Sequence, residues 1–140
     1  MEASYRLFSG MAAGAAPLVA PAAPLVACTA GCIAVDFAAG IAASRTTARR
    51  AGRRWYFESC EAWRTVQKLA LASTAIVMAA VLDGCMEGIV RLELARLFAG
   101  FTCGVELWSF LENACEISDA PLFRYLRRYA RRRIRQEVER

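Results

Sequence analysis

The sequence predicts an all-α integral membrane protein with three transmembrane helices, or four, an interfacial helix and a basic amphipathic helix at the C-terminus. Hydrophobic residues make up 57% of the 140 residues, above the roughly 45–50% that is usual in soluble domains. The mean hydropathy is +0.30 although the chain carries 18 basic residues. Apolar runs and arginine blocks alternate, as in membrane proteins with charged loops and tails. We therefore expect a membrane domain over residues 1–120 and a cytoplasmic tail helix over residues 121–140.

Prolines interrupt the apolar N-terminal part of the chain, where Pro17, Pro21 and Pro24 lie close together. Proline inside a helix removes a hydrogen bond and clashes with the preceding turn, so we do not expect one long helix here. We expect a short or interfacial helix over about residues 5–16 and a first span over about residues 24–44, with Pro24 in its first turn. If the short helix also crosses the membrane, there are four spans rather than three, and the sequence leaves this open.

An arginine-rich segment and a group of aromatic residues follow the first span. Residues 44–54 contain five arginines and no acid, which indicates a cytoplasmic loop under the positive-inside rule. The aromatic residues at 55–57 are typical of a belt at the membrane interface. Residues 58–68 fit an amphipathic helix that lies on the membrane surface.

Two further spans are predicted before the tail. The first covers about residues 66–82 if Lys68 directs its amine outward from the lipid. Asp83 and Gly84 then indicate a turn on the outer side. The last span covers about residues 88–111.

Charged residues lie at both ends of this last span. Glu93 and Arg96 are three residues apart, so their side chains can pair on a helix. Pro121 ends the connection after the span, and the tail beyond it holds eight arginines and two glutamates. Apolar residues recur there at intervals of three and four, which predicts a basic amphipathic helix. Because two spans separate the tail from the arginine-rich segment 44–54, both can lie on the cytoplasmic side of the membrane.

Two acidic residues fall inside predicted spans, and both are candidate functional residues. Asp36 lies in the first span and Glu106 in the last, where it shares a helix face with Phe110 and Asn113. A carboxylate at the centre of a membrane helix costs about 2.5–3.5 kcal/mol on insertion scales, so we expect each to be paired, protonated or in contact with water. A proton relay is disfavoured, because neither span holds a histidine or a second acid at relay spacing.

Other candidate chemistry is sparse. The six cysteines come without any histidine, so mixed Cys/His zinc patterns are excluded, and we expect no metal or cofactor. The segment 25–28 resembles a lipobox, yet the chain stays apolar after Cys28, which disfavours cleavage there. No nucleotide-binding or hydrolase motif is present, and we do not expect an enzyme.

Small residues predict close helix packing in the last span. Gly100 and Gly104 form a Gly-x-x-x-Gly pair, the spacing that lets membrane helices approach closely. The pattern does not identify the partner helix, so packing within the chain and packing between copies both remain open.

The segment 105–113, Val-Glu-Leu-Trp-Ser-Phe-Leu-Glu-Asn, resembles the Glu-Leu-x-Ser-Ile-Leu-Glu-Asn signature of the phage holin and toxin-secretion holin family. The matching positions are Glu106, Leu107, Ser109, Leu111, Glu112 and Asn113. Asp36 and Gly40 resemble the family's Asp-x-x-x-Gly, while Lys68, Asp83 and Pro121 stand where that family places a lysine, a Leu-Asp pair and a proline.

The resemblance implies a holin, which oligomerises in the bacterial inner membrane and forms lesions that release an endolysin or toxin. The implied partners are further copies of the chain and the bilayer with its anionic headgroups, with the endolysin as cargo that is not bound directly. Basic residues next to apolar runs favour such lipids over nucleic acid. Two alternatives remain: a non-enzymatic membrane scaffold or accessory subunit, in which the buried acids only pair across helices, and a small oligomeric channel.

Overall fold

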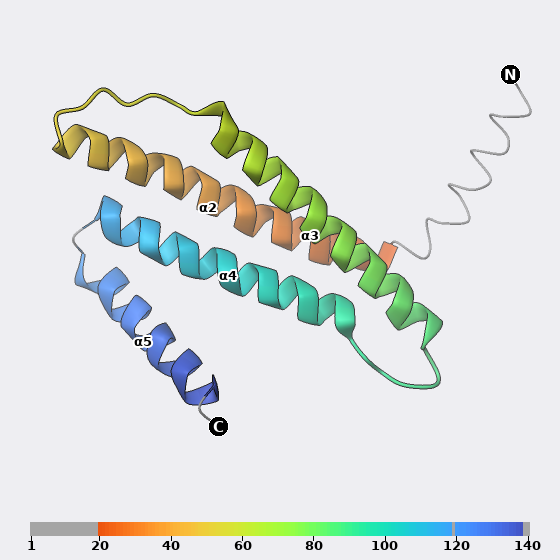
Figure 1. Cartoon of the computed structure of the whole chain (residues 1–140). Coiled ribbons are helices and arrows are strands. Elements are labelled where there is room, and N and C mark those ends of the chain that lie inside the picture. Colours follow the sequence, from red (N-terminus) through yellow and green to blue (C-terminus); the bar gives the residue numbers. More distant parts are fainter. Residues whose placement is uncertain (1–19, 119, 139–140) are drawn as a thin grey trace, which may run out of the picture. The chain divides into compact units, whose positions relative to one another are not determined.

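The computed structural model describes residues 20–118 and 120–138, and the regular structure in these ranges is entirely helical. A 3-10 turn, η1 (Ala20–Ala22), leads into α2 (Ala23–Arg50), and α3 (Ser59–Cys85), α4 (Leu94–Ile117) and α5 (Pro121–Val138) follow (Figure 1). The predicted all-α class is confirmed. The short helix expected over residues 5–16 lies outside the described residues.

Three of the described helices are long and apolar enough to cross a membrane: Ala20–Arg50, Ser59–Cys85 and Leu94–Ile117. In the most apolar window of each, 22% of the residues or fewer are buried. Large apolar side chains such as Leu71, Met78 and Phe101 are exposed. Soluble monomers rarely expose extended apolar surface, whereas lipid tails solvate it without cost. The chain is therefore a multi-pass membrane protein.

The chain forms two compact units, and each of α2, α3 and α4 contributes to both. The first unit holds the beginning of α2 together with Val66–Cys103. Its core is made mainly of alanine, from Ala22, Ile76, Ala79, Ala95 and Ala99. Because alanine lets helix backbones approach closely, dispersion contacts between the helices stabilise this core without large side chains.

The second unit holds Cys32–Thr65 and Gly104–Arg140. Its buried apolar residues lie on α2 and α4, at Ile33, Ala39, Ala43, Leu111 and Ala114. The buried positions on α2 recur at intervals of three and four, so one stripe of this helix faces the interior of the unit. Asp36 and Glu106 are also buried here, which sets this unit apart from the alanine core of the first.

α2 extends further than the sequence indicated. The segment expected as a loop, residues 44–54, is helical as far as Arg50. Arginine is a strong helix former, and the exposed end of α2 accommodates its charge, so the loop prediction was wrong for this part. The helix ends in a Schellman motif, in which the Arg53 N–H donates to the Ala48 carbonyl at 2.9 Å. Gly52 makes the reversal with a φ of 64°, a conformation that costs glycine little.

α3 joins two segments that were expected to be separate. It begins at Ser59 and runs without a break to Cys85, so residues 58–68 are not a helix of their own. It also passes through Asp83 and Gly84, where a turn was expected. The turn comes directly after Cys85 instead, because the Asp83 carboxylate is bonded to the start of α4.

α4 begins at Leu94 rather than at residue 88, because the backbone before it is not helical. Gly88 has a φ of 90° and Glu93 a φ of 51°, and neither value is compatible with a right-handed helix. The predicted Glu93–Arg96 pair is confirmed, with 3.2 Å between Oε1 and Nη1. α4 continues past the signature segment to Ile117.

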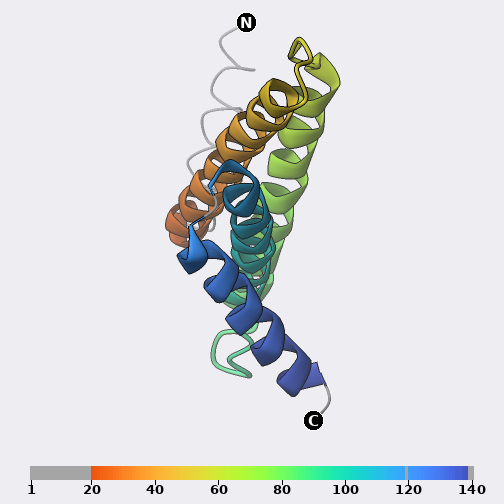
Figure 2. The same ribbon diagram turned by 90° about the vertical axis from the view of Figure 1, so that its left-hand side faces the viewer.

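α5 begins at Pro121, which suits the first helical position because the missing N–H would be unpaired there in any case. The helix turns away from the end of α4, as both views show (Figures 1 and 2). Most of its described side chains are exposed, including Leu122, Tyr125 and Ile134. Most of its arginines lie on the other side of the helix from these apolar residues, while Arg133 shares the apolar side with Tyr129, so the predicted amphipathic helix is present.

Candidate functional site

Asp36 and Asn113 meet between α2 and α4 in the second unit. The Asn113 Nδ2 donates a hydrogen bond to Asp36 Oδ1 at 3.0 Å. Asp36 is 8% exposed, so this contact is made in the interior of the unit. A carboxylate accepts such a bond more strongly than a neutral oxygen does, and the bond offsets part of the cost of its burial. The last residue of the signature thus binds the first residue of the Asp-x-x-x-Gly motif.

Gly40 lies one turn after Asp36 and faces the same pair. A Cβ added at Gly40 would lie 3.6 Å from Asn113 Nδ2, which is an ordinary van der Waals distance. The motif therefore supplies a carboxylate and a small surface on one helix face, against which the Asn113 amide packs.

Glu106 is buried on α4, two turns before Asn113, and only 2% of it is exposed. Positions seven apart share a helix face, so the expected common face of Glu106 and Asn113 is present. Every buried side-chain nitrogen and oxygen among the described residues has a hydrogen-bond partner. With Asp36 and Asn113, Glu106 forms a set of polar residues inside the second unit, which we call the polar seam.

The other predicted positions do not converge on the polar seam. Leu107 and Glu112 are exposed, Ser109 is half-buried, and Leu111 is buried on α4. Lys68 is an exposed residue of α3, and Pro121 is the first residue of α5. The signature segment therefore has one buried face, which carries Glu106 and Asn113, and one exposed face, which carries Leu107 and Glu112.

Asp83 caps α4 from the end of α3. Its Oδ1 accepts from the N–H of Leu94 and its Oδ2 from the N–H of Ala95, both at 2.9 Å. The first N–H groups of a helix have no partner within it, and a negative charge at this end is favoured by the helix dipole. Asp83 thereby ties α3 to α4 within the first unit.

No described residue packs against the two glycines of the Gly-x-x-x-Gly pair. Gly100 and Gly104 are exposed, and a Cβ added to either would meet no atom within 4 Å. The neighbouring Ala95 and Ala99 lie in the core of the first unit instead. Within residues 20–118 and 120–138, the alternative of packing within the chain is therefore not realised at these glycines.

Arginine and aromatic side chains hold the linker between α2 and α3 against α2. Trp55 donates from Nε1 to Ser44 Oγ at 3.1 Å, and the Arg45 guanidinium lies 4.3 Å from the centre of the Trp55 ring. The ring of Phe57 meets that of Phe37 edge-on, at 6.4 Å between centroids. Such cation–π and edge-to-face contacts each contribute about 0.5–1.5 kcal/mol.

A family model described as the bacteriophage holin family matches residues 16–130, which include the polar seam, Asp83 and the glycine pair. The chain belongs to the bacteriophage holin family. Comparisons with curated proteins and with solved structures gave no match.

Two of the sequence motifs that resemble the holin family contact each other in the structure. Asn113 is 77 residues from Asp36 in the chain, yet in the structure it lies next to both Asp36 and Gly40. Pro121 also falls inside the matched range, while the last residues of α5 lie beyond it.

Several contacts in this holin family member were not predicted from the sequence. Thr29 is buried and lies 3.7 Å from the Cys103 sulfur, between α2 and α4 of the first unit. Arg50 donates to the Glu116 carbonyl at 3.1 Å, close to the C-terminal end of α4, where a cation is favoured. A polar residue inside an apolar run is the one signal that marked Thr29, and nothing in the sequence paired residues so distant.

Proposed function

We propose that this chain acts as a holin: copies assemble in the bacterial inner membrane and form lesions through which an endolysin or toxin leaves the cytoplasm. It acts without enzymatic chemistry and without binding that cargo. The observation that supports this proposal best is the polar seam, because Asp36 and Glu106 are buried and Asn113 is partly buried between helices that expose large apolar side chains. If helices rearrange between copies, these side chains are suited to line water, which replaces the partners they lose.

The glycine pair supports assembly from copies of the chain. Its backbone is exposed on α4 between large apolar side chains such as Leu97 and Phe101. In lipid, helices associate through close packing rather than through the hydrophobic effect, and glycine permits the closest approach. The occupant that we propose for this face is a helix of a second copy.

The charges support a cytoplasmic position for the arginine-rich end of α2 and for α5. On this topology the exposed arginines of α5 meet anionic headgroups, at about 1 kcal/mol for each basic residue near the surface. The hydroxyl of Tyr129 accepts from Arg133 Nε at 3.4 Å, and this bond raises the pKa of the Arg133 guanidinium above its ordinary value. Arg133 therefore keeps its positive charge at physiological pH.

The proposal is tested by expression in a bacterial host that carries a membrane-potential dye, with and without a cytosolic cell-wall hydrolase. We expect delayed, abrupt depolarisation, and lysis only when the hydrolase is present. Glu106→Gln keeps the size of the buried side chain and replaces its carboxyl group with an amide, so the time of onset should change. Glu112→Gln, on the exposed side of the same helix, is the matched control and should keep the wild-type onset.

Other outcomes distinguish the alternatives. An unchanged potential at full membrane expression would contradict the holin proposal and favour a scaffold. Ion-specific currents without passage of the hydrolase would favour a small channel.

A further inference from the structure

A cavity of ≈ 390 Å³ opens in the second unit between the end of α2, the linker after it and the end of α4. Its size lies near the lower end of the roughly 300–1,000 Å³ found for small-molecule pockets. Ser44, Arg53, Tyr56, Glu58 and Glu116 are among its lining residues. These side chains are exposed, so the cavity is open to the outside.

The walls of this cavity are held in place by the contacts already described. The Schellman motif at Gly52 fixes the direction in which Arg53 leaves α2. The bond from Trp55 to Ser44 and the stacking of Arg45 on Trp55 hold the linker. A preformed pocket of this kind loses little entropy when a ligand binds.

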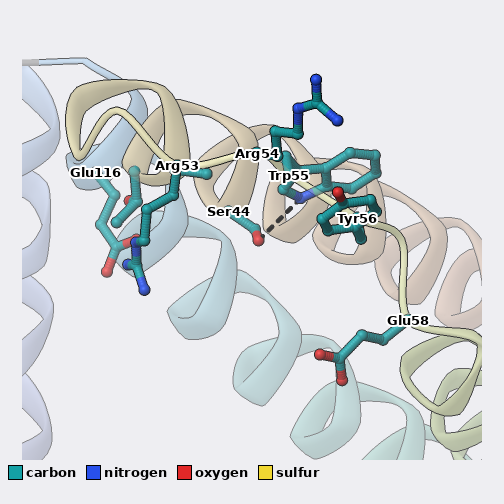
Figure 3. A pocket seen from close by; sticks show the side chains of 9 residues that line it. Ser44, Arg53, Arg54, Trp55, Tyr56, Glu58 and Glu116 are labelled. Atoms are coloured by element: carbon teal, nitrogen blue, oxygen red, sulfur yellow. Dashed lines mark hydrogen bonds between the residues drawn. The ribbon is translucent and has the colours of Figure 1, made fainter.

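The lining side chains carry charges of both signs. Figure 3 shows the Arg53 and Glu116 side chains on one side of the cavity and Glu58 on the other, and Arg54 is a further lining residue. Ser44 Oγ accepts the Trp55 N–H, which leaves its own hydroxyl hydrogen for a ligand. The cavity thus offers donors to a phosphate and the Glu58 carboxylate to an ammonium group.

We propose that this cavity binds the phosphoethanolamine headgroup of a membrane aminophospholipid. Arg53 and the Ser44 hydroxyl bind the phosphate, because a guanidinium matches the geometry of phosphate oxygens. Glu58, on the side opposite Arg53 and Glu116, accepts hydrogen bonds from the primary ammonium, which has three N–H donors. A purely anionic headgroup brings no cation to the Glu58 carboxylate, and a choline group has no N–H to donate.

The position of the cavity favours a lipid over a soluble phosphoethanolamine. α2 and α4 are both long enough to span the membrane, and the cavity lies at their C-terminal ends. Trp55 and Tyr56 line it, and such amphipathic rings are enriched at the level of the headgroups.

The test uses the full chain in lipid nanodiscs that contain equal parts of phosphatidylethanolamine, phosphatidylglycerol and phosphatidylcholine. Native mass spectrometry then counts the lipids that stay bound. We expect phosphatidylethanolamine to be retained several-fold over the other two. In Glu58→Gln this preference should fall to about one, and Arg53→Gln should reduce the retention of phosphatidylethanolamine. Arg49→Gln, an exposed arginine of α2 that does not line the cavity, is the matched control and should behave as the wild type.

Three results would overturn the proposal. Phosphatidylglycerol could be retained as well as phosphatidylethanolamine, or Glu58→Gln could keep the wild-type preference. Displacement of the lipid by free phosphoethanolamine at equal concentration would show a soluble ligand instead. Because all of the substituted residues are exposed, we expect the variants to keep the wild-type helix content, as measured by circular dichroism.

Discussion

Asp36 shows how one buried carboxylate can join two helices at a distance of 77 residues in the chain. In a double-mutant cycle of Asp36→Ala and Asn113→Ala, we expect a coupling free energy of about 0.6–2 kcal/mol, the range for hydrogen bonds between membrane helices. The measurement is the free energy of unfolding in detergent. Asp36→Ala combined with Glu112→Ala is the control, and these two changes should be additive because Glu112 lies on the exposed side. Additivity in the Asn113 cycle as well would contradict the contact.

Asp83 carries a second prediction for a single residue. Asp83→Ala leaves two N–H groups at the start of α4 without their acceptor, and losing a helix cap costs about 0.5–2 kcal/mol. We expect faster amide exchange at Leu94 and Ala95 and a lower melting temperature. Asp83→Asn keeps one acceptor oxygen, so its exchange rates and melting temperature should fall between those of Asp83→Ala and the wild type. Exchange rates equal to those of the wild type would show that the cap is not made.

Single residues also show what the sequence could and could not reveal. Asp36, Glu106 and Asn113 were recognisable one by one, because polar residues are costly inside apolar runs. Their arrangement in space could not be predicted. In the sequence α3 lies between α2 and α4, and no local rule sets the rotation of one helix relative to the other. The Glu93–Arg96 pair was predicted correctly, since it depends only on spacing within the chain.

At the scale of the element, the glycine face of α4 carries a prediction about assembly. Gly100→Leu/Gly104→Leu should leave the monomer folded, because nothing lies within 4 Å of an added Cβ. The bulk should weaken self-association by about tenfold, or about 1.4 kcal/mol. Analytical ultracentrifugation in detergent measures this change. Gly31→Leu on α2 is the control, since Gly31 also faces open space; an equal loss there would contradict a specific face.

Helices were easier to predict than their ends. Pro121 marked the start of α5 because proline has a fixed place in a helix. The start of α4 was misplaced because Ile89, Val90 and Leu92 extend the apolar run without being helical. The cap from Asp83 determines that boundary, and it comes from another helix.

At the scale of the whole molecule, the topology can be tested with the chain's own cysteines. Cys60 and Cys85 are exposed near opposite ends of α3. If the arginine-rich segments are cytoplasmic, a membrane-impermeant maleimide should label a variant that keeps only Cys85 in intact spheroplasts. A variant that keeps only Cys60 should be labelled only after permeabilisation. Labelling of Cys60 but not of Cys85 in intact spheroplasts would instead place α5 on the outer side of the membrane.

The two helix contacts made by carboxylates also imply an order of assembly. The Asp83 cap closes a loop of 11 residues, whereas the Asp36–Asn113 bond closes one of 77. For flexible chains this sevenfold difference in length corresponds to about 1.7 kcal/mol of extra closure entropy. We therefore expect α3 and α4 to enter the bilayer as a hairpin, and α2 to dock on α4 afterwards. The contact that forms last in one copy is then the one most readily exchanged with a neighbour, and a cross-link between Asp36→Cys in one chain and Asn113→Cys in another would capture that exchange.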